Sequence, residues 1–170
     1  MRGMIRRVSR LFPLAALPLL LAGCAPVAAP PPASAPDAPP AAAATNGTRI
    51  LDRAAADRLL GARGITLQWI DWDRRGTLSA RDEGGTIRLS GVQTARDGPG
   101  RLTLEGEVVE IGADYFVFDG TIRIAHTPDP GRLCEADKTW HFAITQNRPY
   151  WRLREFEWCD GLTDYVDIYF

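Results

Sequence analysis

Signatures of metal binding and catalysis are scarce in this chain. Its 170 residues include only two histidines and three cysteines, and no two cysteines have CxxC spacing. A zinc site is therefore poorly supported. The sequence also lacks GxSxG, HExxH, P-loop and GxGxxG patterns, which mark common hydrolases and nucleotide-binding enzymes. We expect no metal and no cofactor, assign no catalytic residue, and expect a binding or structural protein in preference to an enzyme.

Positive charge is also sparse and dispersed. Lys138 is the one lysine, and the arginines form no basic run. The first 23 residues carry four of the twenty basic residues and no acidic one, so the rest of the chain has sixteen basic and twenty-one acidic residues. A mildly acidic chain is a poor candidate for binding nucleic acid or an anionic lipid surface.

The start of the chain has the features of an export signal. A basic segment is followed by an apolar run over 11–20, too short to cross a bilayer, and then by Leu21-Ala22-Gly23-Cys24. This motif resembles the lipobox of bacterial lipoproteins. The resemblance implies cleavage before Cys24, fatty acylation of that residue and attachment to a membrane through the lipid. Ala25 in place of an aspartate implies, for that class, an outer-membrane location with the domain in the periplasm. An ordinary secretory signal is the alternative.

Composition divides the chain into three parts. Residues 1–23 are the expected signal peptide, and 24–48 are the acylated cysteine with a tether rich in alanine and proline. Such a tether samples extended polyproline II conformations and cannot build a core. Residues 49–170 have the composition of a single globular domain of common size.

The pattern of that domain is mainly β. One helix is predicted over 51–62, where five apolar side chains share a face: Leu51, Ala54, Ala55, Leu59 and Leu60. Segments rich in β-branched and aromatic residues, separated by turn signals, then predict strands at 65–72, 76–80, 86–94, 101–111, 115–125, 139–145, 150–158 and 164–170. Eight short strands with short connections predict a small antiparallel barrel, with a sandwich as the alternative.

Two glycines fall on the inward faces of adjacent predicted strands. Gly106 and Gly120 alternate in register with the apolar residues around them. A glycine at such a position either permits a sharp bend of the barrel or leaves room for a ligand. We favour the bend.

The positions of the later cysteines predict a disulfide. Cys134 and Cys159 lie at equal distances in sequence from the Gln146-Asn147 pair. An antiparallel hairpin turning there would place the two thiols opposite each other, in a periplasm that is oxidising. With Cys24 acylated, a Cys134–Cys159 disulfide is favoured over a free pair or a metal site. The same register pairs Phe142 with Trp151, Trp140 with Leu153, and Lys138 with Glu155.

That hairpin also contains an ambiguity. If its alternation continued unbroken, Glu155 and Glu157 would face the core, where burial would raise their pKa values and make them a candidate acid and base pair. A bulge near Arg154 would instead turn the neighbouring aromatic side chains inward, and we favour the bulge. A small periplasmic hydrolase using these glutamates, or His141 with a carboxylate, is the alternative function.

Arginines and aromatics gather along one short segment of the hairpin. A guanidinium beside an aromatic ring can bind an anion, a sugar or an aromatic group by hydrogen bonding and stacking. We predict a binding site there, for a small ligand, a glycan or an envelope protein; the alternative is that the arginines pack on the aromatics of their own hairpin. The predicted residues are Arg148, Tyr150, Trp151, Arg152 and Arg154.

Acidic residues near the end of the domain suggest turns in preference to calcium binding. Asp160, Asp164 and Asp167 do not have the spacing of a twelve-residue calcium loop. Aspartates commonly stabilise turns through hydrogen bonds to nearby backbone N–H groups.

Overall fold

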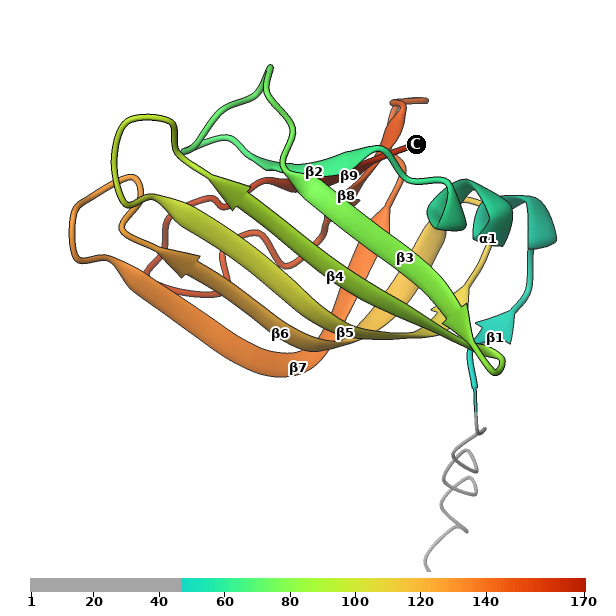
Figure 1. Cartoon of the computed structure of the whole chain (residues 1–170). Coiled ribbons are helices and arrows are strands. Elements are labelled where there is room, and N and C mark those ends of the chain that lie inside the picture. The colour runs from blue at the N-terminus through green and yellow to red at the C-terminus, as the bar shows by residue number, and fades with distance from the viewer. Residues whose placement is uncertain (1–46) are drawn as a thin grey trace, which may run out of the picture. The chain divides into compact units, whose positions relative to one another are not determined.

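The computed structural model describes residues 47–170 of the protein. These residues form nine strands and one helix (Figure 1): β1 (Arg49–Ile50), α1 (Arg53–Leu60), β2 (Gly64–Leu67), β3 (Thr77–Glu83), β4 (Thr86–Thr94), β5 (Arg101–Ile111), β6 (Tyr115–Ala125), β7 (Leu133–Ala143), β8 (Tyr150–Leu153) and β9 (Val166–Tyr169).

Eight of the strands form one antiparallel sheet that curls into a nearly closed barrel. Their order is β2-β9-β8-β7-β6-β5-β4-β3, and β1 pairs in parallel with β5 outside this path. A single bridge between Ile65 and Gly76 joins the two ends of the sheet, through N–H to carbonyl hydrogen bonds of 2.8 and 3.3 Å. The predicted barrel with one short helix is therefore confirmed. Closure leaves few unpaired edges, which are sites of aggregation in open sheets.

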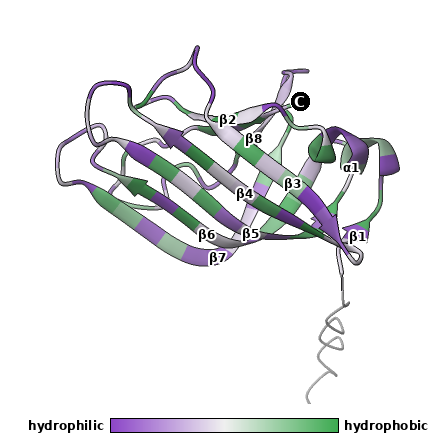
Figure 2. Ribbon diagram, in the orientation of Figure 1, coloured by the Kyte–Doolittle hydropathy of each residue, from purple (hydrophilic) through white to green (hydrophobic). Residues whose placement is uncertain are grey.

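The central strands owe their form to alternation of apolar and polar residues, which a register shift at Val108–Glu110 interrupts in β5. β4, β5 and β6 have the predicted bounds of 86–94, 101–111 and 115–125. Along β5, Leu102, Leu104 and Val108 are buried while Arg101, Glu105 and Glu107 are solvent-exposed or partly exposed. Figure 2 shows the same alternation of hydrophobic and hydrophilic residues along the neighbouring strands. One face of the sheet therefore builds the core and the other contacts water.

Gly106 and Gly120 allow two strands to come unusually close. They pair directly across β5 and β6. A Cβ atom at Gly106 would lie 2.2 Å from the carbonyl oxygen of Asp119, and one at Gly120 would lie 2.3 Å from that of Glu105. The ring of Phe118 occupies the space beside both glycines, so no room for a ligand remains there. The glycines allow the backbones of β5 and β6 to approach each other closely, and Figure 1 shows both strands curving along their length.

The helix is shorter than predicted and its buried face is different. Asp52 caps it, with a side-chain oxygen accepting the N–H of Ala55 at 2.7 Å. The buried side chains are Ala55, Ala56 and Leu59. The expectation for Leu51 was wrong: it precedes the helix and is 55% exposed.

Large aromatic side chains fill the barrel interior. Phe116 stacks on Phe142 with ring centroids 4.8 Å apart, and Trp151 meets Phe116 edge-on at 5.7 Å. Trp140 is also fully buried. Such side chains contribute most of the area that a small core can remove from water.

The β7–β8 hairpin differs from its predicted register by two residues. Phe142 pairs with Leu153 and Ala143 with Arg152, where the prediction paired Phe142 with Trp151. The connection is a six-residue loop, 144–149, in which Gln146 and Asn147 both have positive φ, in place of a two-residue turn. A shift by two keeps every side chain on its predicted face, because the side-chain period of a strand is two.

The hairpin strands also have different lengths from those predicted. β7 begins six residues earlier, at Leu133, and pairs with β6 over its full length. β8 ends at Leu153, after which the chain leaves the sheet. The predicted bulge near Arg154 is therefore wrong, because the strand stops there. Phe156 and Trp158 are both half-buried, but only Trp158 packs against the core.

Within residues 47–170, no helix has the length and apolar character needed to cross a membrane.

Candidate functional site

A surface pocket of about 370 Å³ lies where the β7–β8 connection meets the segment after β8. Arg148, Arg152 and Arg154, three of the five residues predicted to bind a ligand, line it. The other lining residues carry no negative charge: Thr145, Gln146, Phe156 and Tyr165. We refer to these seven residues as the arginine pocket.

The remaining two predicted residues have other roles. Tyr150 lies behind the pocket, with its ring centroid 5.8 Å from Cζ of Arg148 and 5.2 Å from Cζ of Arg152. Trp151 is fully buried in the core and does not line the pocket, so its predicted ligand contact was wrong. Alternation explains the difference, because neighbours along a strand point to opposite faces.

Arg152 is held in place by a buried partner. Its Nε and Nη2 atoms donate to the two carboxylate oxygens of Asp167, each at 2.7 Å. Asp167 is fully buried, and the Arg152 side chain is 12% exposed. Burial raises the pKa of Asp167 while Arg152 opposes that rise, and the hydrogen bond to Asp167 raises the pKa of Arg152. The Arg152 guanidinium also lies over the Tyr165 ring, 4.1 Å from its centroid.

Arg148 and Arg154 have no acidic partner among the residues that the structure describes. Arg148 donates to the side-chain oxygen of Gln146 at 2.5 Å, within the turn that its own N–H closes onto Thr145. The guanidinium of Arg154 lies 5.9 Å from the ring centroid of Phe156. Two cationic groups therefore stand at the pocket without a carboxylate in direct ion-pair contact.

A histidine and a glutamate contact each other on the barrel surface near this pocket. Glu155 accepts the backbone N–H of His141 at 3.0 Å, and its other oxygen lies 2.5 Å from Nδ1 of the same histidine. Burial alone would raise the pKa of Glu155, but the hydrogen bonds from His141 outweigh it and lower that pKa. Glu157 is exposed, so the inward pair of glutamates considered from the sequence does not form.

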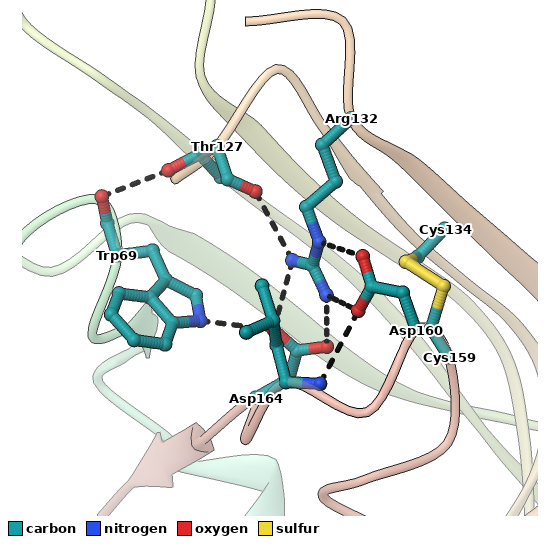
Figure 3. The surroundings of a disulfide bond; sticks show 8 residues. Trp69, Thr127, Arg132, Cys134, Cys159, Asp160 and Asp164 are labelled. Atoms are coloured by element: carbon teal, nitrogen blue, oxygen red, sulfur yellow. Dashed lines mark hydrogen bonds and ion pairs between the residues drawn. A yellow bond between two sulfur atoms is a disulfide. The ribbon is translucent and has the colours of Figure 1, made fainter. Parts of the chain in front are cut away.

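A charge cluster centred on a buried arginine, which the sequence did not reveal, lies beside the disulfide (Figure 3). Arg132 is 4% exposed in its side chain and binds two carboxylates at once. It donates to both oxygens of Asp160 and both oxygens of Asp164, over 2.8 to 3.0 Å, and to the carbonyl of Thr127 at 3.1 Å. Trp69 donates its indole N–H to Asp164 at 3.0 Å. We call Arg132, Asp160 and Asp164 the Arg132 cluster; it ties three loops together at one end of the barrel.

The predicted Cys134–Cys159 disulfide is present. The Cα atoms are 5.9 Å apart, and the bond joins β7 to the segment that follows β8, not to a paired strand. A carboxylate oxygen of Asp160 and the two sulfur atoms all lie within 4.8 Å of one another. A disulfide has no thiolate with which to bind a metal. We therefore interpret the cysteine pair as a covalent link between two segments. The bond and the Arg132–Asp160 ion pair connect the same two segments (Figure 3).

The acidic residues near the end of the domain have two different roles. The interpretation as turn residues was wrong for Asp164 and Asp167, which are fully buried and paired with arginines. Asp160 accepts the N–H of Leu162 at 3.4 Å as well as the Arg132 guanidinium. The sequence around an aspartate does not show whether it stabilises a turn or forms a buried ion pair, because the partner arginines lie 15 to 32 residues away.

The fold and the site together define a small antiparallel β-barrel protein with an arginine-lined surface pocket. The chain belongs to the PM1083 family, which matches residues 47–170. It is 36% identical over 117 residues to a protein of Pasteurella multocida (strain Pm70) described as "Uncharacterized protein PM1083", in an alignment that covers 67% of this chain and 74% of the relative. No solved structure matches the chain significantly.

Proposed function

We propose that this protein is a lipid-anchored component of the bacterial cell envelope whose β-barrel domain binds a small anionic ligand at the arginine pocket. The anchor is Cys24, in the motif Leu21-Ala22-Gly23-Cys24, which lies outside the described residues. The domain would face the periplasm from the outer membrane, at the end of the tether over 24–48.

The observation that carries the binding role is the charge of the pocket. Its seven lining residues include three arginines and no acid, in a chain with more acidic than basic residues after residue 23. Arginines kept apart from carboxylates repel one another and remain hydrated, so grouping them has an energetic cost that an anion would offset. Some other surface arginines are compensated by an acid, as Arg123 is by Glu135 at 2.8 Å.

The anchor is tested by replacing its acylation site. Cys24→Ser removes the only thiol that the lipobox motif offers, so the variant should no longer fractionate with membranes. Two or three acyl chains are enough to hold a protein on a bilayer. Residues 47–170 contain no helix that could span one. A Cys24→Ser protein that stays with the membrane fraction after a carbonate wash would contradict the anchor.

The binding site is tested with the protein from its own envelope. Native mass spectrometry of the full chain, released in mild detergent, should show an added mass that is lost in Arg148→Gln and in Arg154→Gln. These two residues are chosen because neither is tied to a buried acid, so the fold should be unaffected. Removal of one charged hydrogen bond should weaken binding by about 1.5 to 3 kcal/mol. An added mass retained in both variants would place the ligand elsewhere.

A hydrolase that uses His141 and Glu155 is the second candidate. The 2.5 Å contact between Nδ1 and the carboxylate favours it, since a carboxylate that orients a histidine is a recurrent part of general-base sites. Turnover of ester or glycoside substrates that disappears in His141→Gln, with the fold intact by circular dichroism, would support this candidate. A panel without turnover would reject it.

A further inference from the structure

We infer that the ligand of the arginine pocket carries a phosphate group. This inference rests on the proposed binding function and concerns the chemistry of the same site. A phosphate monoester carries a charge of about −1.5 to −2 at neutral pH and presents three strong acceptor oxygens.

The charge of the pocket favours a dianion. Arg152 is neutralised by Asp167, which lies fully buried behind it and not in the pocket lining. Arg148 and Arg154 form no ion pair within the described residues, so each can offer its charge to a ligand. A single carboxylate would balance only one of them, whereas a phosphate monoester balances both.

The hydrogen-bond donors point to the same conclusion. Arg152 uses Nε and Nη2 on Asp167, and its Nη1 has no partner among the described residues. Arg154 has no hydrogen-bond partner for its guanidinium within that part of the chain, and Arg148 uses only Nη2. One arginine fork is enough to satisfy both oxygens of a planar carboxylate. Donors from three guanidinium groups match a tetrahedral group with three oxygens better.

The arginines are also partly ordered before a ligand arrives. Arg152 is fixed by its two 2.7 Å bonds and by Tyr165. Arg148 is bonded to Gln146 and lies against Tyr150. Holding long side chains in place in advance lowers the entropy lost on binding. Phe156 and Tyr165, whose ring centroids are 5.5 Å apart, provide an apolar wall for the remainder of the ligand.

Calorimetric titration of the full chain in detergent, at constant ionic strength, tests the inference. The probes are inorganic phosphate, glycerol 3-phosphate, soluble dihexanoyl phosphatidic acid and, as carboxylates, acetate and succinate. Arg148→Gln and Arg154→Gln are compared with Arg53→Gln, an exposed arginine on α1 that serves as a charge-matched control. We expect the phosphates to bind at least tenfold more tightly than succinate, with a loss of tenfold or more in each pocket variant and none in Arg53→Gln.

The outcomes separate the inference from the proposed function. Succinate binding as tightly as the phosphates, and still lost in the pocket variants, would overturn the phosphate assignment and leave the anion site in place. Equal loss in Arg53→Gln would show nonspecific attraction and overturn the inference. No binding of any probe, with no added mass in the native spectrum, would overturn both. Preference for the phosphatidic acid over glycerol 3-phosphate would identify a lipid headgroup as the source, and the reverse a soluble ester; either supports the inference.

Discussion

The Arg132 cluster makes the strongest prediction for stability. Arg132→Met keeps the length of the apolar stem but removes all five hydrogen bonds of the guanidinium. Asp164, which is fully buried, would then keep only the indole N–H of Trp69 as a partner. Removing one partner of a buried ion pair costs about 3 to 5 kcal/mol, because the remaining charge stays out of water without compensation.

A surface ion pair of the same geometry provides the control. Arg123 and Glu135 are joined by a nitrogen-to-oxygen distance of 2.8 Å, equal to that between Arg132 and Asp164, but their side chains are 38% and 53% exposed, against 4% and 0% in the buried pair. Arg123→Met should therefore cost about 1 kcal/mol or less, the usual range for exposed pairs. The two pairs have the same ion-pair distance and differ in burial and in the number of hydrogen bonds that the arginine makes.

Urea unfolding measures both variants. With a slope of about 1.5 kcal/mol per molar, the loss in Arg132→Met corresponds to a midpoint lower by about 2 to 3 M. This loss is a large share of the 5 to 15 kcal/mol of a typical domain, so near-ultraviolet circular dichroism should first show that the variant is folded. A midpoint change no greater than that of Arg123→Met would refute the reasoning that burial makes this pair essential.

Three further predictions concern the covalent link, the close strand pair and pH. Replacing both Cys134 and Cys159 by serine should lower the free energy of unfolding by about 3.5 kcal/mol, the value of the chain-entropy model for a 25-residue separation. Adding reductant to the wild type should have the same effect. A smaller change in either experiment would mean that the Arg132–Asp160 ion pair suffices to hold the segment after β8. Gly106→Ala should destabilise by more than about 3 kcal/mol, since its Cβ would lie 2.2 Å from the Asp119 carbonyl oxygen, and a thermal midpoint within a few degrees of the wild type would contradict that geometry. Hydrogen bonding to Arg132 lowers the pKa of Asp160 to about 2, below its unfolded value of 3.8. The stability that this carboxylate contributes should therefore be complete above about pH 5 and be lost as the pH falls from 4 to 2. The stability difference between the wild type and Asp160→Asn should shrink over that range, and a constant difference would exclude the linkage.

Local pattern determined the central part of the barrel. β4, β5 and β6 have strong alternation and turn residues at both ends, so their bounds and inward faces followed from the sequence alone. The Cys134–Cys159 disulfide was predicted from the equal sequence distances of the two cysteines from Gln146-Asn147, together with the expectation that Cys24 is acylated. The arginine pocket was partly predictable for a related reason: Arg148, Arg152 and Arg154 are close in sequence, and the hairpin keeps them close in space.

Only the tertiary structure decided the roles of the charged residues and the bounds of the irregular strands. The first half of β7, with Glu135, Asp137 and Lys138, has little intrinsic strand preference and is a strand because β6 pairs with it. Arg132 and Arg152 look like any other arginine in the sequence, yet they are the ones that meet Asp164 and Asp167 inside the protein. Periodicity along a strand indicates which way a side chain points. An ion pair depends instead on which distant segment of the chain packs beside that side chain, and the local sequence does not determine that packing.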